Sequence, residues 1–279
     1  MTCRNEEKYV RETLESLELQ SFKPTEVIII DDASNDNTYY IMQEIAKRNG
    51  WKTSRKEKND EKYSSIVSSL RIASSLMSND YDFIMVLDGD TVLESHYIEK
   101  ILQKFEADPK LGIAGGSLRN YDMNIDLKTI AKLNSDVFGC NRIYSRKCWN
   151  DVNVGKLLTV NTIIWDPEHS AKAAVRGYTV RRFDDIISHA LRLPRFVVPS
   201  FSKGILSYCF GYSLPTALIS AFISRDLKFL AGYLLALVSQ EKKIDNNENM
   251  KKMRKTYEAE YIRMLYSRLL VRIRSRKYP

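Results

Sequence analysis

Two short apolar runs that each end in aspartate constrain the fold of this chain most. Residues 26–31 read Glu-Val-Ile-Ile-Ile-Asp and continue with Asp32, and residues 82–88 read Asp-Phe-Ile-Met-Val-Leu-Asp and continue with Gly89 and Asp90. A continuous apolar run of this length, bounded by turn-forming residues, is typical of a strand that is buried on both faces. Both runs therefore predict strands of a parallel sheet.

Helical patterns separate these strands. We expect helices from about Glu7, from Asn37 or Thr38 as cap through Ala46, over Tyr63–Met77 and over His96–Phe105, with a further strand at Leu111–Gly116. Less regular segments predict helices over 127–133 and 167–176 and strands over 139–144 and 178–182. Strands that alternate with helices indicate an α/β fold.

The last third of the chain changes character. Leu214–Ile223 and Phe229–Val238 are apolar runs of ten residues each, too short to span a bilayer as helices. In Lys251–Lys277 apolar residues recur every three to four positions among basic ones, which predicts a basic amphipathic helix. We therefore expect an α/β domain over residues 1–200 and a helical region over 201–279. This region could lie on an anionic membrane surface or pack against the first domain or a second subunit.

Charge and cysteine content exclude several classes of protein. The net charge of +8 favours an anionic partner, either a nucleic acid, a phosphorylated metabolite or an anionic membrane. The basic residues gather in the tail and no nucleic-acid-binding motif is visible, so we do not expect a nucleic acid. Four cysteines without a Cys-x-x-Cys pair, beside three histidines, exclude zinc fingers and indicate a reducing compartment. The polar N-terminus is not a signal peptide.

Aspartates follow both predicted strands where ligands bind in open α/β sheets, beyond the carboxyl ends. They are Asp31, Asp32, Asp88 and Asp90. Oxygen ligands at such an edge suit Mg²⁺ or Mn²⁺, which usually shares them with substrate phosphates, and Gly89 would allow a close approach. The alternative is that each aspartate only caps a loop or the next helix.

A fifth acid, Asp166, precedes Pro167. Because proline is favoured at the first position of a helix, Asp166 could be the N-cap of a helix that starts at Pro167. The functional alternative is a general base held at a helix start near the metal site.

Taken in chain order, several segments resemble the family 2 glycosyltransferases with a GT-A fold. The matching segments are Thr2–Glu7, Val27–Thr38, Met85–Thr91, Gly139–Arg146, and Trp165-Asp166 followed by Gly177-Tyr178. The resemblance as a whole covers about residues 1–212. The family's G-K-x-x-A segment is replaced by Lys62–Arg71. Its first strand would precede Thr2, whereas this sequence starts at Met1, so the first strand is expected to be truncated. Either the true start lies upstream or the donor site is damaged.

The resemblance implies a Rossmann-like mixed sheet flanked by helices, with a C-terminal helical extension. It implies metal-dependent, inverting transfer of a hexose from a UDP- or GDP-linked donor to a hydroxyl or phosphate of a glycan or lipid-linked acceptor. The implied cofactor is Mg²⁺ or Mn²⁺, and the implied location is cytoplasmic, peripheral on the cytoplasmic face of the membrane. Two alternatives stay open: a nucleotidyltransferase, and an inactive membrane-associated scaffold that retains the fold.

The resemblance also implies roles for individual residues. The nucleotide-sugar would be bound by Thr2, Asn5, Asp31 and Asp88. Asp90 would bind the metal, and Asp166 would deprotonate the acceptor.

Further along the chain, His189 would help to hold the metal or diphosphate, or is structural. Arg192, Arg195 and Lys203 are candidates for binding the diphosphate, or are solvated surface residues.

Overall fold

A computed structural model describes residues 1–57, 65–121, 137–152, 165–192, 200–209 and 211–241. The chain forms two compact units, Met1–Leu193 and Pro194–Pro279, whereas the sequence suggested a division after residue 200. The helices expected over 127–133 and over Lys251–Lys277 lie outside the described residues.

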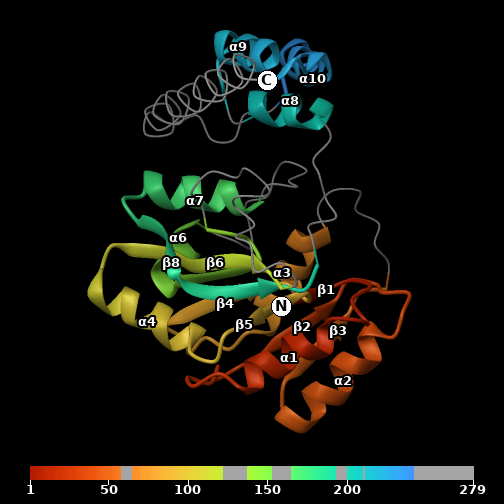
Figure 1. Ribbon diagram of the computed structural model, residues 1–279, viewed down its shortest axis with the longest axis vertical. Coiled ribbons are helices and arrows are strands. Elements are labelled where there is room, and N and C mark those ends of the chain that lie inside the picture. The colour runs from red at the N-terminus through yellow and green to blue at the C-terminus, as the bar shows by residue number, and fades with distance from the viewer. Residues whose placement is uncertain (58–64, 122–136, 153–164, 193–199, 210, 242–279) are drawn as a thin grey trace, which may run out of the picture. The chain divides into compact units, whose positions relative to one another are not determined.

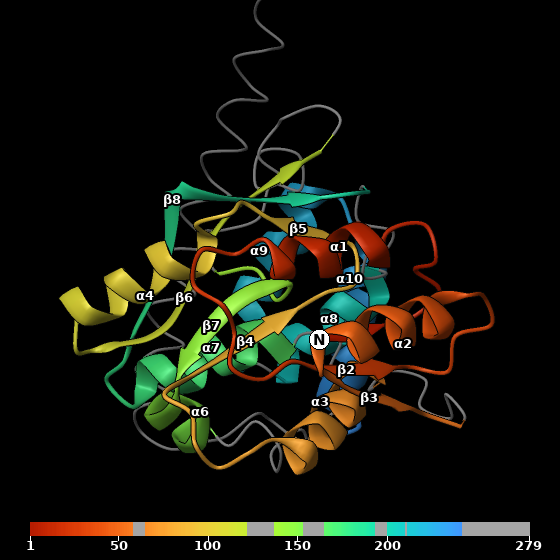
Figure 2. The same cartoon turned by 90° about the horizontal axis from the view of Figure 1, so that it is seen from below.

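The first unit begins with a parallel sheet whose strand order is β1-β2-β3. The elements in chain order are β1 (Thr2–Cys3), α1 (Val10–Glu18), β2 (Ile28–Asp31), α2 (Thr38–Asn49) and β3 (Lys52–Arg55). Helices α1 and α2 lie on one side of this sheet and α3 (Ser65–Leu76) on the other (Figure 2). The apolar run predicted as a buried strand forms β2, every residue of which is buried.

The start of α2 differs from the expected cap. Asn37 occupies the N-cap position, but its side chain makes no capping hydrogen bond. Instead, Asp36 Oδ1 accepts the backbone N–H of Thr38 at 3.0 Å. The Thr38 hydroxyl is engaged elsewhere, because it accepts the backbone N–H of Glu6 at 2.7 Å. Asp36 therefore caps α2, and Thr38 ties the helix to the segment that follows β1.

A second, mixed sheet of five strands completes the first unit, in the order β4-β7-β6-β8-β5. Its strands are β4 (Phe83–Leu87), β5 (Thr91–Leu93), β6 (Leu111–Asn120), β7 (Asn141–Ser145) and β8 (Thr179–Ala190). Strands β6 and β8 run parallel, and the other neighbouring pairs run antiparallel. The helices are α4 (Tyr97–Ala107) on one face and α6 (Arg146–Val152) and α7 (Trp165–Val175) on the other (Figure 1). The expectation of a mixed sheet flanked by helices is confirmed.

One pairing connects the two sheets. Thr2 pairs with Ile30 of β2 on one side and forms an isolated parallel bridge with Asp88 on the other. Because Asp31 ends β2 and Asp88 directly follows β4, the carboxyl ends of these strands meet at one edge of the unit.

The second unit contains α8 (Ser200–Cys209), α9 (Leu214–Ser224) and α10 (Leu227–Val238). Side chains of Ser213 and Asp226 cap α9 and α10. The backbones of α8 and α10 touch, because a Cβ added to Gly232 would lie 1.9 Å from the Phe201 carbonyl oxygen. None of the helices in the described ranges combines the length and the apolar character needed to cross a membrane.

Candidate active site

Two neighbouring acids, Asp88 and Asp90, come together at the strand edge with Asp166, which lies much further along the chain. Asp88 directly follows β4, and its backbone N–H donates to the Cys140 carbonyl at 3.2 Å. Asp166 lies in the first turn of α7, where a Cβ added to Gly139 would come within 3.2 Å of its Oδ2. The negative charges of Asp90 and Asp166 both act on Asp88. The structure therefore gathers Asp88, Asp90 and Asp166 in one carboxylate cluster.

The cluster keeps Asp88 partly protonated near neutral pH. Burial, and then the charges of Asp90, Asp166 and Glu6, raise the pKa of Asp88 to about 7. Burial disfavours the charged form of a carboxyl group, and nearby like charges do the same. Between Asp88 and Asp90, a Cβ on Gly89 would come within 2.8 Å of Cys3 Sγ. This contact gives Gly89 a packing role that the sequence did not indicate.

Arg192 brings positive charge to the cluster. It lies just after β8, and its Nε donates to Asp90 Oδ2 at 2.5 Å while its Nη2 donates to Glu6 Oε1. The backbone holds this arrangement, because Leu191 N–H donates to the Asp90 carbonyl at 2.9 Å. The sequence proposed Arg192 as a ligand of a diphosphate. In the structure its guanidinium binds two carboxylates instead.

The carboxylate oxygens of Asp88 and Asp90 fit a hard divalent cation. Mg²⁺ is usually held by one or two carboxylates together with substrate phosphates and water. A cation beside Asp88 would favour its charged form, against the burial that raises its pKa. Within the described ranges, no three His, Cys, Asp or Glu side chains are placed to hold a metal ion. The role of Asp90 as a metal ligand stays a prediction.

His189 has partners of its own on β8. It pairs with Val92 across the sheet, its Nε2 lies 3.6 Å from Glu94 Oε1, and its ring packs edge-on against Tyr121. These contacts couple the imidazole to Glu94, and its role in metal binding stays a prediction. Of the other candidate cations, Arg195 lies outside the described residues and Lys203 is exposed on α8.

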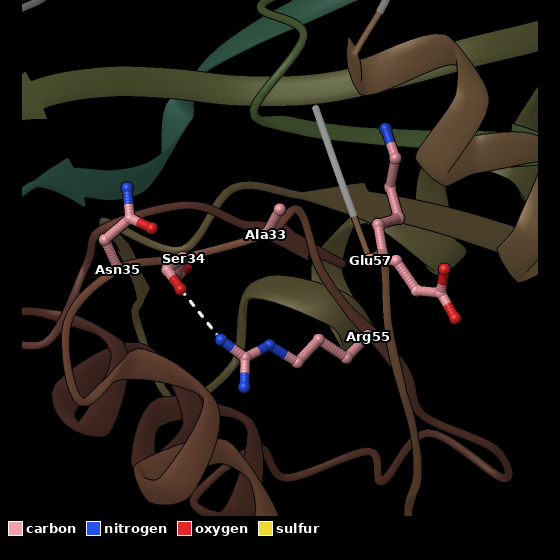
Figure 3. Close-up of a pocket in the computed structure, with 6 residues that line it drawn as sticks. Ala33, Ser34, Asn35, Arg55 and Glu57 are labelled. Atoms are coloured by element: carbon pink, nitrogen blue, oxygen red, sulfur yellow. Dashed lines mark hydrogen bonds between the residues drawn. The ribbon is translucent and has the colours of Figure 1, made fainter. Parts of the chain in front are cut away.

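A pocket of about 450 Å³ opens beyond β2 and β3 (Figure 3). Its lining residues are Ala33, Ser34, Asn35, Arg55, Lys56 and Glu57. Arg55 Nη2 donates to the Ser34 carbonyl at 2.9 Å, the contact drawn in Figure 3, and Arg55 Nε forms an ion pair with Asp31 Oδ2 at 3.1 Å. The other oxygen of Asp31, Oδ1, is buried and accepts no hydrogen bond from the described residues. It is therefore an acceptor for which no residue in the described ranges supplies a donor.

Residues near the N-terminus hold the loop that lines this pocket. Asn5 adopts a left-handed conformation with φ of 53°. Its side-chain Oδ1 accepts the Asn35 backbone N–H at 2.9 Å, and its own N–H donates to Ser34 Oγ at 3.0 Å. Thr2 lies between β2 and Asp88. Thr2 and Asn5 thus have structural contacts, and their roles in donor binding stay predictions.

The surroundings of Asp166 suit a general base. Helix α7 begins at Trp165 rather than at Pro167, so Asp166 belongs to the first turn and is not the cap. Burial raises the pKa of Asp166, whereas the charge of Arg142 and the backbone N–H of Gly139 lower it. A carboxylate whose pKa is raised toward neutrality is a more effective proton acceptor.

The sequence reasoning missed three charged residues of this region: Glu6, Arg55 and Arg142. Glu6 and Arg142 lie inside segments of the family resemblance, Thr2–Glu7 and Gly139–Arg146, which was the available signal for both. Arg55 ends β3, a strand without an apolar run. Arg142 lies inside β7 and is fully buried, although an arginine in a strand is normally exposed.

Comparison with known sequences gives a family match. Residues 1–158 match the family described as Glycosyl transferase family 2. A poly-beta-1,6-N-acetyl-D-glucosamine synthase of Staphylococcus epidermidis is 30% identical over 141 residues, which is 50% of this chain and 33% of that protein. The same-named synthase of Staphylococcus aureus (strain COL) is 29% identical over 119 residues, 43% of this chain and 27% of that protein. The match therefore spans between about a quarter and a third of the length of these relatives.

Solved structures show the same fold. The mannosyltransferase PcManGT from Pyrobaculum calidifontis, in complex with GDP-Man and Mn²⁺, superposes with a TM-score of 0.58 at 16% identity, over 96% of this chain and 84% of that one. TarS residues 1–349 from S. aureus, in complex with UDP-GlcNAc, superposes with a TM-score of 0.55 at 18% identity, over 74% of this chain and 63% of that one. At these identities the likeness establishes the GT-A fold alone.

We predict that Asp88→Asn stabilises the protein increasingly as the pH rises from about 4 to about 7. The folded state holds a proton on Asp88 that the unfolded chain has already lost, so the wild type loses stability across this window. The asparagine variant does not lose stability in this way, because its amide does not titrate. Above pH 7 we expect a gain of about 4 kcal/mol, because the pKa of Asp88 rises from 3.8 to about 7 on folding and each unit of pKa difference corresponds to about 1.4 kcal/mol.

Chemical denaturation at a series of pH values measures this gain. The matched control is Asp80→Asn, which makes the same chemical change on an exposed residue. A stability difference between Asp88→Asn and wild type that is the same at pH 4 and pH 8 would show that Asp88 is ionised throughout this range.

Proposed function

This chain is a member of glycosyl transferase family 2, and on that premise we propose that it transfers a sugar from a nucleoside-diphosphate donor to an acceptor with inversion, assisted by a divalent cation. One observation carries the proposal. Asp88, Asp90 and Asp166 gather at the edge where β2 and β4 end, and the pocket beyond β2 and β3 opens at this edge. A donor bound along it would meet a cation site at one end and a base at the other.

The proposed reaction assigns separate tasks to these residues. Asp90, with Asp88, would hold Mg²⁺ or Mn²⁺, which neutralises the charge that develops on the leaving diphosphate. For Asp90 to do so, Arg192 must release its Oδ2, and the freed guanidinium can then bind a phosphate oxygen. Asp166 would take the proton from the acceptor hydroxyl as that oxygen attacks the sugar. Attack from the face opposite the diphosphate inverts the sugar carbon and needs no enzyme nucleophile.

For the donor we propose a UDP- or GDP-linked hexose, and for the acceptor a hydroxyl or phosphate of a glycan or lipid-linked molecule. Structures of the same fold hold UDP-GlcNAc and GDP-Man, which supports a nucleotide-sugar for this chain. Family membership favours sugar transfer over nucleotidyl transfer. The remaining alternative, an inactive scaffold, predicts that no nucleotide binds, so nucleotide binding is the first property to measure.

We predict that one nucleoside diphosphate stabilises the protein against heat only when Mn²⁺ is present. The probes are UDP, GDP and dTDP, with CMP for comparison, each with and without Mn²⁺. A ligand at 100 times its Kd adds about 2.7 kcal/mol to native stability. Asp90→Ala should remove the Mn²⁺-dependent part, whereas Asp80→Ala, on an exposed position, should keep it. Absence of stabilisation by every nucleotide contradicts the proposal and favours the scaffold.

We also predict that Asp166→Asn binds the donor nucleotide normally but transfers sugar about 10²–10⁴-fold more slowly, which is the usual contribution of a general base. The amide keeps the size of the side chain but cannot accept the proton. The measurements are thermal stabilisation by the nucleotide and the release of nucleoside diphosphate in the presence of acceptor. Transfer at the wild-type rate would show that another group is the base.

For the second unit we propose peripheral binding to an anionic membrane at the cytoplasmic face, which would suit a lipid-linked acceptor. The turn between α9 and α10 supports this. Phe222 and Leu227 are 82% and 78% exposed, and the basic residues Arg225 and Lys228 stand beside them. Exposed apolar side chains among basic ones are typical of segments that rest in the membrane interface.

Vesicle flotation tests this binding. We expect the protein to float with vesicles that contain phosphatidylglycerol and not with pure phosphatidylcholine. The double variant Phe222→Ser/Leu227→Ser should lose at least half of the bound fraction. Leu19→Ser, which removes an equally exposed apolar side chain from the first unit, should not. If the double variant and Leu19→Ser bind the vesicles equally well, the protein contacts the membrane through other residues.

A further inference from the structure

Arg142 is a fully buried arginine in the middle of β7. Arginine is almost never fully buried unless its donors are paired. Here the guanidinium donates to backbone carbonyls of two different segments. Nη1 donates to the Asp166 carbonyl at 2.9 Å, Nε donates to the Phe138 carbonyl at 3.3 Å, and Nη2 donates to the Val137 carbonyl. One side chain therefore joins the loop before β7 to the first turn of α7.

The same two segments surround the carboxylate of Asp166. The loop before β7 continues to Gly139, whose backbone N–H lies close enough to that carboxylate to lower its pKa. The contact leaves no spare room, because a Cβ on Gly139 would lie 2.9 Å from Trp165 Cζ2 and 3.2 Å from Asp166 Oδ2. Any shift of this loop relative to α7 would therefore move the Asp166 carboxylate.

Arg142 is itself fixed on several sides. Its Nη1 lies 3.2 Å from the Tyr144 hydroxyl, and that hydroxyl lies 3.0 Å from His169 Nδ1, on the same side of α7 as Asp166. The guanidinium also packs over the ring of Trp165, 5.4 Å from its centroid. Burial, followed by the charges of Arg142 and Lys172, lowers the pKa of His169 well below its ordinary value, so the ring is neutral. These contacts leave Arg142 little freedom to move.

We propose that Arg142 is a positioning residue, which holds the Asp166 carboxylate where it can accept a proton from the acceptor. The inference rests on the proposed function for the step that Asp166 performs. Its basis in this chain is that one guanidinium binds both segments that surround the carboxylate. Arg142 acts through Asp166 and does not touch the substrate itself.

The test compares three variants of the full chain in the transfer reaction. Arg142→Lys keeps the charge but loses the planar, forked donor set, and Arg142→Met loses both. We expect kcat to fall at least tenfold in Arg142→Lys and further in Arg142→Met, because a displacement of about 1 Å can cost about 10²-fold in rate. The KM for the donor should stay within twofold. The control is Arg146→Met, on an exposed arginine that stacks on Tyr81, which should keep the wild-type kcat.

A double-mutant cycle then separates positioning from general support of the fold. If Arg142 acts through Asp166, Arg142→Lys should add little to the loss already caused by Asp166→Asn. A folded Arg142 variant with wild-type kcat overturns the inference. An Arg142 variant that mainly raises KM also overturns it. So does a double variant in which the fold-losses in kcat of the two single variants multiply, because the two residues would then act independently.

Two outcomes need separate treatment. If both Arg142 variants fail to fold, Tyr144→Phe takes their place. It removes the hydroxyl that contacts Arg142 and His169, and it leaves the positive charge of Arg142 unchanged. A several-fold fall in kcat supports the inference, and an unchanged kcat overturns it. If the wild-type chain transfers no sugar from any donor, the proposed function fails. Failure of the inference alone requires an active wild type.

Discussion

Negative charge gathered in partly buried positions at the carboxyl edge of the sheets is the constraint on which this structure depends. Asp88, Asp90 and Asp166 are close enough to influence one another, and Glu6 adds a fourth carboxyl group. Buried charges cost several kcal/mol unless they are paired or protonated. The protein uses both solutions. Arg192 pairs with Asp90 and Glu6, and the raised pKa of Asp88 keeps it partly protonated at neutral pH.

The two arginines that stabilise this edge come from different parts of the mixed sheet. Arg192 follows β8, and Arg142 lies inside β7. Strand β6 lies between these two strands and pairs with both of them. The mixed sheet thus places Arg192 beside Asp90 and Arg142 beside the segment that carries Asp166. In this family 2 chain, a cation bound at Asp90 would take the place of Arg192 there. The contact of Arg142 with the segment of Asp166 would stay unchanged.

The sequence predicted those parts of the fold that depend on local patterns. Apolar runs identified β2 and β4, and the alternation with helices identified the fold class. Strand β3 was missed because Lys52–Arg55 contains no apolar residue, and it exists because β2 supplies its hydrogen bonds. Strands β6 and β8 extend beyond the expected limits because they pair with each other as far as Asn120 and Ala190. Pairing between distant segments decided each of these differences.

The candidate site shows the same division. Aspartates after apolar strands could be identified from the sequence, but their partners could not. Arg192 is 102 residues from Asp90, and the β5–β8 pairing brings them together. An arginine at position 142 is normally read as a solvent-facing residue of a strand. Only the fold shows that backbone carbonyls surround it.

The bridge between Thr2 and Asp88 makes the catalytic unit modular. The parallel sheet carries the pocket beyond β2 and β3, helix α7 beside the mixed sheet carries Asp166, and the two-residue strand β1 joins the two sheets. Under the proposed function, substitutions at residues 33–35 and 55–57 would change which nucleotide fits without touching the neighbours of Asp166. In an evolving lineage, donor preference and acceptor chemistry could change independently, as long as the junction at Asp88 is kept.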